Sequence, residues 1–325
     1  MTDELVPAAA LTAWLQRTGL RDAGAGPVRL SRVSGGKSHL MMRVEAGERR
    51  WILRRPPKVA AAGANRGIER EYRILGALRD TPVPAPAPVA LCTDESVLGA
   101  SFLLMSEVAG VHPMRAEVGD DPGLGTAVLD AMVDVLVDLH AVDHRAAGLA
   151  DFGRPEGFHV RQVQRWTDQL ASYRGRPLDG LARVGDWLAA HLPPDFEPTI
   201  MHGDYHMRNV LAELQPARIT AVLDWETSTI GDPLLDVAGL AEVWRTVFPG
   251  DHPWPGDDHV LTRYAAATGR PIDHARYYRV LYNFRLAVLL EGIHQRSLAD
   301  PTRTPDPSTA ALVDRCLTRA TELIG

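Results

Sequence analysis

The pattern of apolar residues changes about one third of the way along this 325-residue chain. Between residues 28 and 108, apolar residues occur in short or alternating runs interrupted by Gly, Pro and charged residues, which is typical of β-strands. From about residue 124 onward they recur every three or four residues, which is typical of amphipathic helices. A strand-rich first third and a helix-rich remainder predict an α+β fold of two lobes with a cleft between them.

The boundary between the lobes is predicted near Ala109-Gly110. Residues 1–108 are expected to form an antiparallel sheet lobe with one helix, and residues 109–325 a larger, mainly helical lobe. The first lobe has predicted strands at 28–33, 40–44, 51–54 and 102–108, and a predicted helix at 68–78. The second lobe has a predicted hairpin of strands 209–214 and 218–223, and predicted helices at 124–140, 160–174, 178–191, 233–246, 258–268, 273–298 and 307–323.

Composition excludes several classes of protein. The formal net charge of −6 argues against nucleic acid as the main partner, because binding a phosphate backbone needs a basic surface. The 2 cysteines are too few for a disulfide framework or a four-cysteine zinc site. The first residues lack the basic start and apolar run of a secretion signal, and no stretch approaches the roughly 20 apolar residues that cross a bilayer. We therefore expect a cytoplasmic protein that is not inserted in a membrane.

Residues 202–226 carry the strongest chemical pattern in the sequence. The segment HGDYHMRN at 202–209 is followed, fifteen residues after its Asn209, by DWE at 224–226. Phosphoryl transfer to a hydroxyl needs one carboxylate that accepts or orients the hydroxyl proton, and two oxygen ligands for magnesium. Asp204, Asn209 and Asp224 supply these types of group. Because the predicted hairpin places Asn209 at the start of one strand and Asp224 at the end of the other, we expect both at the same edge.

HGDYHMRN followed by LDWE resembles the catalytic-loop and metal-binding motifs of the aminoglycoside phosphotransferase family, which is related to choline kinases and protein kinases. The resemblance implies a protein-kinase-like fold, with Asp204 as catalytic base and with Asn209 and Asp224 holding Mg²⁺ and ATP or GTP. It implies transfer of the γ-phosphate to a hydroxyl of a small-molecule acceptor. The segment GDPLLD at 231–236 is similar to the GDP…D segment of the family, which implies that Asp232 and Asp236 anchor the active-site loops.

Two other functions remain open on the residues alone. His202, Asp204 and His206 alternate, so in a strand they would face one side and could bind zinc in a metal-dependent hydrolase. In a kinase, His202 would instead support the loop by hydrogen bonding, and the role of His206 stays open. The third hypothesis is a nucleotide-binding pseudokinase that acts as a scaffold, although the presence of Asp204, Asn209 and Asp224 argues against it.

The first lobe of such a kinase must bind the nucleotide. Ser34-Gly35-Gly36-Lys37-Ser38 lies between two predicted strands, where a flexible turn lets backbone N–H groups approach phosphate oxygens. A Gly-Gly pair is also a common hairpin turn, so this segment alone is a weak signal. Lys37, in a chain with very few lysines, is a candidate to reach a phosphate.

A strand arginine and a helix glutamate are expected to form the ion pair that a strand lysine and a helix glutamate form in protein kinases. Arg54 ends the predicted strand 51–54, and Glu71 lies on the apolar face of the predicted helix. A carboxylate on an apolar face is costly unless it is paired, so Arg54 is its expected partner. Arg55 and Lys58 are the alternatives for the phosphate contact.

Residues 102–108 resemble the strand and hinge that join the lobes in this family. There the hinge backbone binds the adenine edge, which implies main-chain contacts from Glu107 and Val108, with Met105 shaping the pocket.

The acceptor pocket is expected in residues after 240. Tyr282, Arg285, Glu291 and His294 lie along one predicted helix, where a solvated face is the simpler interpretation for most of them. The region has no dense run of acids of the kind that would suit a polycationic acceptor. Aminoglycosides, other antibiotics, hydroxylated metabolites and hydroxyacyl compounds therefore all remain open as acceptors.

Overall fold

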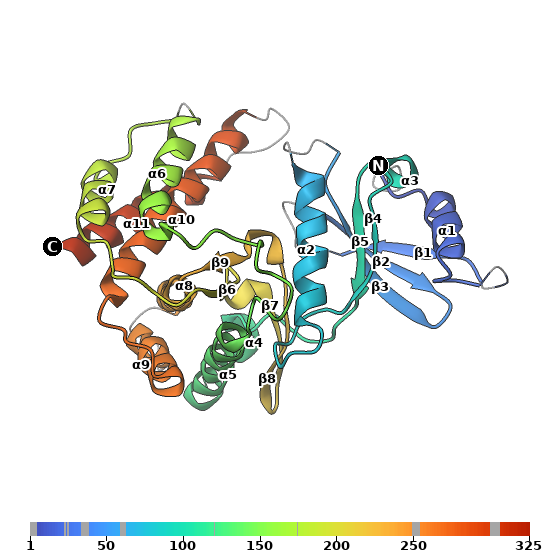
Figure 1. The fold of residues 1–325 in the computed structure, drawn as a ribbon, viewed down its shortest axis with the longest axis horizontal. Helices are drawn as coiled ribbons and strands as arrows, with labels where there is room; N and C mark the ends of the chain where they lie inside the picture. The colour runs from blue at the N-terminus through green and yellow to red at the C-terminus, as the bar shows by residue number, and fades with distance from the viewer. Residues whose placement is uncertain are drawn as a thin grey trace.

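The chain folds into a sheet-containing lobe and a helical lobe, with helix α2 (Ala64–Leu78) between the sheet and the second lobe (Figure 1). The structure is a computed structural model that describes residues 5–22, 24, 26–33, 39–58, 63–119, 121–173, 175–248, 254–299 and 306–325. The predicted α+β fold of two lobes is confirmed. Among the described residues, no helix is both long and apolar enough to span a lipid bilayer.

The first lobe is built on a five-stranded antiparallel sheet with the order β1-β2-β3-β5-β4. Its strands are β1 (Arg29–Arg32), β2 (Leu40–Ala46), β3 (Arg49–Arg55), β4 (Pro88–Cys92) and β5 (Phe102–Ser106). Neighbouring residues of the central strand β3 enter different cores, because side chains alternate across a strand. Ile52 packs with Ile68 of α2, whereas Leu53 packs with Trp14 of α1 (Ala8–Arg17). The two helices thus cover opposite faces of the sheet.

The first lobe contains more helix than the sequence predicted. Besides α2, its described residues form α1 and the short α3 (Glu95–Leu98), so the prediction of one helix was wrong. Helix α1 is short, and its N-cap residue Pro7 makes no side-chain capping hydrogen bond, so it carries little local signal. It is held by its buried residues Leu11, Trp14 and Leu15.

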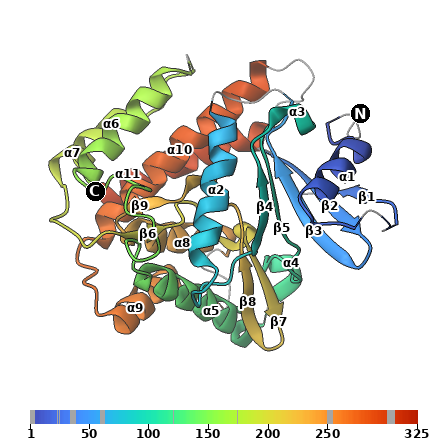
Figure 2. The ribbon, with the colours of Figure 1, turned by 45° about the vertical axis from the view of Figure 1, so that its right-hand side comes forward.

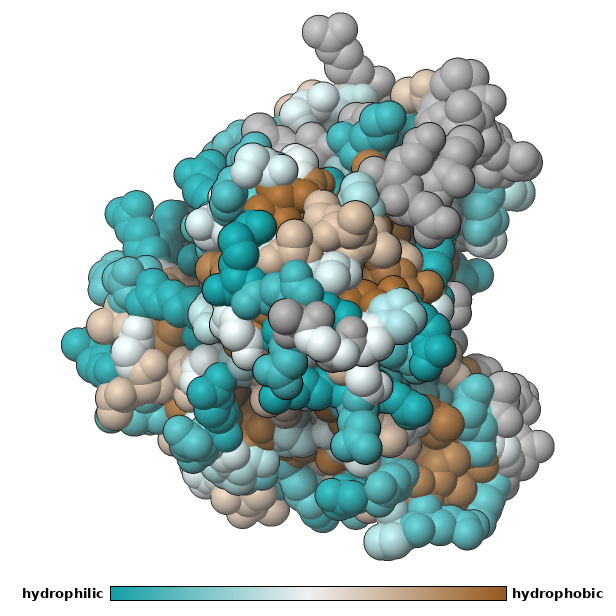
Figure 3. All heavy atoms as spheres, turned by 90° about the vertical axis from the view of Figure 1, so that its right-hand side faces the viewer, coloured by the Kyte–Doolittle hydropathy of each residue, from teal (hydrophilic) through white to brown (hydrophobic). Residues whose placement is uncertain are grey.

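On the face of the molecule seen from the side of this lobe, hydrophilic side chains surround separate hydrophobic patches (Figure 3).

In the part of the second lobe that the structure describes, the seven predicted helices are present, each within a few residues of its expected bounds, together with one additional short helix, α4. Helix α5 begins where expected because Asp121 accepts hydrogen bonds from the backbone N–H groups of Gly123 and Leu124. Helix α10 is the centre of this lobe, since α6, α7, α8 and α11 all pack against it (Figure 2). The bounds are α4 (Arg115–Val118), α5 (Pro122–Ala141), α6 (Phe158–Ala171), α7 (Leu181–Ala190), α8 (Leu234–Val247), α9 (Asp257–Thr268), α10 (Ala275–Ala299) and α11 (Pro307–Ile324).

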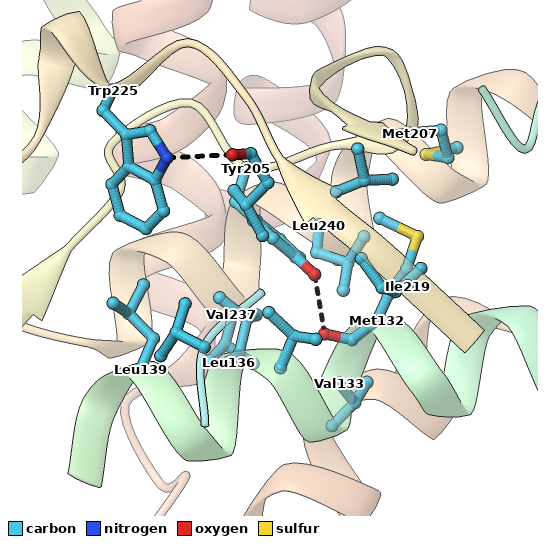
Figure 4. Packing of buried hydrophobic residues seen from close by; sticks show 14 of the residues in the cluster. Met132, Val133, Leu136, Leu139, Tyr205, Met207, Ile219, Trp225, Val237 and Leu240 are labelled. Atoms are coloured by element: carbon cyan, nitrogen blue, oxygen red, sulfur yellow. Dashed lines mark hydrogen bonds between the residues drawn. The ribbon is translucent and has the colours of Figure 1, made fainter. Parts of the chain in front are cut away.

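Two small antiparallel pairs position the predicted catalytic segment. Strand β6 (Thr199–Met201) pairs with β9 (Thr229–Gly231), and the predicted hairpin is formed by β7 (Val210–Leu214) and β8 (Ala217–Val222). Single-turn 3₁₀ helices precede β7 and β9, namely η1 (Met207–Asn209) and η2 (Trp225–Thr227). The buried hydroxyl of Tyr205 donates to the carbonyl oxygen of Met132 in α5 at 3.0 Å, which ties the segment to the helical core (Figure 4).

The linker after β5 lies against the β7–β8 hairpin. Val111 bridges to Ala212, and the Thr220 hydroxyl donates to the carbonyl oxygen of Ala109 at 2.7 Å. Gly110 has φ 145°, and a Cβ there would lie 2.7 Å from the Thr220 Oγ1 atom. This close approach requires glycine, and it fixes the linker at the base of the hairpin.

Candidate active site

The loop after β6 is fixed by contacts with its backbone. The Asp236 carboxylate accepts hydrogen bonds from the N–H groups of His202 at 2.6 Å and Gly203 at 2.8 Å. Gly203 has φ 83°, and a Cβ there would lie 2.6 Å from the carbonyl oxygen of Thr227. The buried His202 ring donates from Nε2 to the Leu223 carbonyl at 2.9 Å and accepts at Nδ1 from the Asp204 N–H at 3.2 Å. Asp236 and His202 therefore make the supporting contacts expected of them.

Asp232 anchors a second part of the lobe. Its carboxylate accepts from the Tyr278 hydroxyl at 2.5 Å and from the Leu234 N–H at 3.0 Å, and it lies 3.0 Å from His159 Nε2. These partners lie on α6, α8 and α10, so Asp232 links three helices behind the loop.

Asp204 presents a carboxylate at the surface of this loop, with 40% of its side chain exposed. The Asn209 amide donates to the Asp204 carbonyl oxygen at 2.8 Å and to its Oδ2 at 3.1 Å, and His206 Nε2 lies 3.5 Å from Oδ1. Burial of the carboxyl acts to raise its pKa, but the hydrogen bond and charge of His206, together with the charge of Arg285, lower the pKa of Asp204 to about 2. The group is therefore an ionised acceptor at neutral pH.

The hairpin brings Asn209 and Asp224 to the same end of its two strands. Val210 pairs with Val222, and the Leu223 N–H donates to the Asn209 carbonyl at 2.7 Å. Asp224 has φ 66°, the one positive φ of a non-glycine residue in the described part of the chain. Such strained conformations concentrate at functional sites.

Asn209 and Asp224 fit a magnesium ion by the chemistry of their donors. Both hydrogen bonds from the Asn209 side chain to Asp204 use its amide nitrogen, which leaves the amide oxygen for a cation. Together with the Asp224 carboxylate, it offers the hard oxygen ligands that Mg²⁺ prefers.

The predicted ion pair between Arg54 and Glu71 is present and buried. Arg54 Nη1 lies 3.0 Å from Glu71 Oε1, and Arg54 Nε lies 3.0 Å from Oε2. The same guanidinium donates through Nη2 to Asp224 Oδ1 at 2.6 Å and lies 3.5 Å from Glu226 Oε2. Burial raises the pKa of Glu71 to about 7, although the charge of Arg54 opposes this shift. Arg54 thus joins the sheet, helix α2 and the Asp224 segment.

The alternatives to Arg54 lie elsewhere. Arg55, the next residue of β3, is turned away and donates to the backbone carbonyls of Leu5, Pro56 and Leu98. Lys58 is exposed. Alternation along the strand explains why only one of the two adjacent arginines contacts Glu71.

Two residues at this site were not among the predicted ones. His39 Nδ1 lies 3.0 Å from Arg54 Nη2 and 3.2 Å from Glu226 Oε2. Burial, and then the charge of Arg54, lower the pKa of His39 to about 4, so its ring is neutral at neutral pH. The only sequence signal for Glu226 was its place two residues after Asp224, and His39 had none.

Five other residues predicted to bind the nucleotide lie outside the described residues. They are Ser34, Gly35, Gly36, Lys37 and Ser38.

Met105, Glu107 and Val108 lie at and just after the end of β5. Met105 is buried in the core beneath α2. The Glu107 carboxylate accepts a hydrogen bond from Arg43 Nε of β2 at 2.7 Å and lies 2.5 Å from Arg43 Nη2. Val108 is half-buried. The Glu107 side chain is thus held by the sheet, and the main-chain contact with the adenine edge stays a prediction.

Helix α10, the helix predicted to carry acceptor residues, is buried at positions that were expected to be exposed to solvent. Tyr282, Arg285 and Glu291 of α10 are all buried, so the solvated-face interpretation was wrong for them. The reason is that neighbouring helices cover α10 on several sides. Glu291 lies 3.3 Å from Arg176 Nε and accepts from Gln295 at 2.7 Å. His294 is half-buried.

The zinc alternative finds no support in the described residues. Both ring nitrogens of His202 are already hydrogen-bonded to backbone groups, and the ring is fully buried. Within the described ranges, no three His, Cys, Asp or Glu side chains come together as metal ligands. The alternation of His202, Asp204 and His206 does not produce a shared face, because the segment is a loop rather than a strand.

A sequence profile of the phosphotransferase enzyme family matches residues 29–280, more than half of the chain. The chain belongs to this family. Among curated proteins, the chain is 33% identical over 287 residues to acyl-CoA dehydrogenase family member 10 of Mus musculus, and the match covers 84% of this chain and 27% of that protein. The chain therefore spans only about a quarter of the length of that relative.

Solved structures show the same fold. A protein of Ralstonia eutropha JMP134 assigned to the aminoglycoside phosphotransferases is 30% identical, with a TM-score of 0.79 and coverage of 97% of this chain and 98% of that one. An aminoglycoside phosphotransferase solved with GDP and kanamycin has a TM-score of 0.67 at 17% identity, covering 96% and 98% of the two chains. The chain therefore has the kinase-like fold of the aminoglycoside phosphotransferases.

Proposed function

We propose that this protein transfers the terminal phosphoryl group of ATP or GTP to a hydroxyl of a small molecule. The observation that carries the proposal is that two predicted sets of residues meet at one place: the Arg54–Glu71 ion pair, and the set of Asp204, Asn209 and Asp224. Arg54, which is paired with Glu71, also contacts Asp224, and the hairpin joins Asp224 to the loop that holds Asp204 and Asn209.

Asp204 is assigned as the group that accepts and orients the acceptor hydroxyl proton. Its carboxylate is partly exposed and ionised at neutral pH, and the Asn209 amide fixes its orientation. Asn209 and Asp224 are assigned to Mg²⁺, which when bound neutralises charge on the phosphates. Asp224 is held in advance by its contact with Arg54.

Arg54 is assigned to the phosphates on the nucleotide side. Its bidentate contact with Glu71 orients the guanidinium, and a planar guanidinium matches phosphate oxygens well. The main chain of Glu107 and Val108 is assigned to the base, with Met105 beneath it. The segment from Ser34 to Ser38 is assigned to the phosphates as well. The structure solved with GDP and kanamycin supports a nucleotide and a hydroxylated acceptor for this fold.

Two measurements on the purified protein test the proposal. Thermal melting with ATP or GTP, with and without magnesium, should show a nucleotide-dependent rise because a ligand of the native state stabilises it. A screen of hydroxylated compounds should then identify acceptors by release of ADP or GDP, with Asp204→Asn as the inactive control. A rise in melting with zinc but not with nucleotide would favour the hydrolase. Nucleotide binding with neither transfer nor slow nucleotide hydrolysis would favour the scaffold.

A further inference from the structure

Arg285 of α10 is a buried cation without an ion-pair partner among the described residues. Only 8% of the residue is exposed, and it makes no hydrogen bond or ion pair with any residue in the described part of the chain. Its guanidinium lies 5.4 Å from the ring centre of Trp166 in α6, and the guanidinium of Arg165 lies 5.0 Å from the same ring. Two positive charges thus gather around one indole, with no carboxylate paired to either among the described residues.

This pair of arginines lies beside the catalytic loop. Trp166, Met201 and Tyr282 belong to one packed cluster, and Met201 directly precedes His202. The charge of Arg285 also acts to lower the pKa of Asp204. They nevertheless form no direct ion pair.

Tyr282 adds a neutral donor on the same side of α10. It precedes Arg285 by three residues, so the two side chains share a helix face. Burial, and then the charge of Asp204, raise the pKa of Tyr282, so its hydroxyl keeps its proton. Among the described residues, the Tyr282 hydroxyl has no hydrogen-bond partner, and its oxygen atom is not completely buried. A guanidinium and a phenol are therefore both available on this face of α10, which packs in one cluster with Met201 at the start of the catalytic loop.

An unpaired buried charge is costly, and natural proteins almost always pair it. A guanidinium with several unused donors matches a carboxylate in bidentate geometry. The same two arginines would repel a polycation such as an aminoglycoside.

We propose that Arg285 and Tyr282 bind a carboxylate of the acceptor, so that the preferred acceptor is a small hydroxy acid. This inference rests on the proposed phosphotransferase function. It places the acid group on the α10 side of Asp204 and the reacting hydroxyl at Asp204 itself.

Matched acceptors test the inference. Hydroxycarboxylic acids with the hydroxyl two, three or four carbons from the carboxyl are compared with their methyl esters, primary amides and amino-alcohol counterparts, with kanamycin as a polycation. The expected result is a higher kcat/KM for the acids than for their matched neutral and cationic forms.

The variants are Arg285→Gln and Arg285→Lys, with Arg296→Gln as control because Arg296 is an exposed arginine of the same helix. Arg285→Gln should raise KM for the acids about 10- to 100-fold, the size expected for one charged hydrogen bond, and should remove the preference over the esters. Arg285→Lys should restore part of the preference, and Arg296→Gln should leave it intact.

Two results would overturn the inference while leaving phosphoryl transfer established. One is a preference of the wild-type protein for neutral or cationic acceptors. The other is an equal fall of kcat on all acceptors in Arg285→Gln, which would place Arg285 on the transferred phosphate. If no acceptor in the panel is phosphorylated and no nucleotide binds, the proposed function itself fails, and the inference fails with it.

Discussion

Two arginines on the two sides of this site are almost equally buried, with 3% of Arg54 and 8% of Arg285 exposed, yet their surroundings are opposite. Arg54 contacts Glu71, Asp224 and Glu226. Arg285 contacts an indole ring and no carboxylate in the described part of the chain. The proposed nucleotide side is therefore already paired in this structure, whereas the proposed acceptor side carries a charge that no carboxylate of the described residues pairs with.

The difference has a physical meaning. Partners that compensate a buried charge stabilise the fold, and they also orient the charge. A buried charge that lacks them lowers stability, and such costs are typical of binding sites. We therefore expect the two arginines to respond oppositely to replacement.

Asp204→Asn tests the group that lies between the two sides and should have the largest effect. The amide cannot accept the hydroxyl proton, so kcat on an identified acceptor should fall about 10²- to 10⁴-fold. The rise in melting temperature with ATP and magnesium should be kept, since Asn209 and Asp224 remain. Wild-type turnover in this variant would remove Asp204 from the chemistry.

Arg54→Met tests the paired side. Removal of one partner leaves Glu71 buried without its counter-charge, so the free energy of unfolding in urea should fall by about 3–5 kcal/mol. The double variant Arg54→Met/Glu71→Leu should recover much of this loss, because both charges are then absent. Equal losses in the single and double variants would show that the two residues are not coupled.

Asp224→Ala separates the metal site from the rest of the nucleotide site. The increase in melting temperature on adding magnesium together with ATP should disappear, since one of two protein ligands of the cation is lost. At saturating ligand the missing stabilisation should be about 2–3 kcal/mol. Arg218→Gln on the exposed hairpin is the control and should keep the increase. An unchanged magnesium effect in Asp224→Ala would place the cation elsewhere.

Arg285→Met tests the unpaired side and should have the smallest effect on folding. Because no carboxylate is left behind, the free energy of unfolding should stay the same or rise by about 1 kcal/mol. Urea denaturation beside Arg54→Met measures the contrast directly. A loss of stability as large as that of Arg54→Met would mean that Arg285 is a structural residue. It would contradict the proposed difference between the two arginines.

The parts of the site that could be predicted from the sequence depend on short distances along the chain. Asp204 and Asn209 are five residues apart and share hydrogen bonds, and a short hairpin sets where Asp224 lies. The partner of Glu71 could be predicted because a carboxylate on an apolar helix face needs a cation. The seven longer helices of the second lobe follow from their apolar spacing.

The parts that could not be predicted depend on long-range packing. Strands β6 and β9 have 3 residues each, too few to show alternation. The burial of Arg285 and Glu291 follows from the helices around α10, and a helix covered on several sides has no single apolar stripe to reveal it. His39 meets Arg54 only through the folded sheet.

A crystal structure of the protein with magnesium and a non-hydrolysable ATP analogue tests the central claim most directly. The account predicts one cation with the Asn209 amide oxygen and the Asp224 carboxylate at about 2.1 Å, beneath the triphosphate and with Asp204 facing the terminal phosphate. A cation and triphosphate bound away from these three side chains would contradict it.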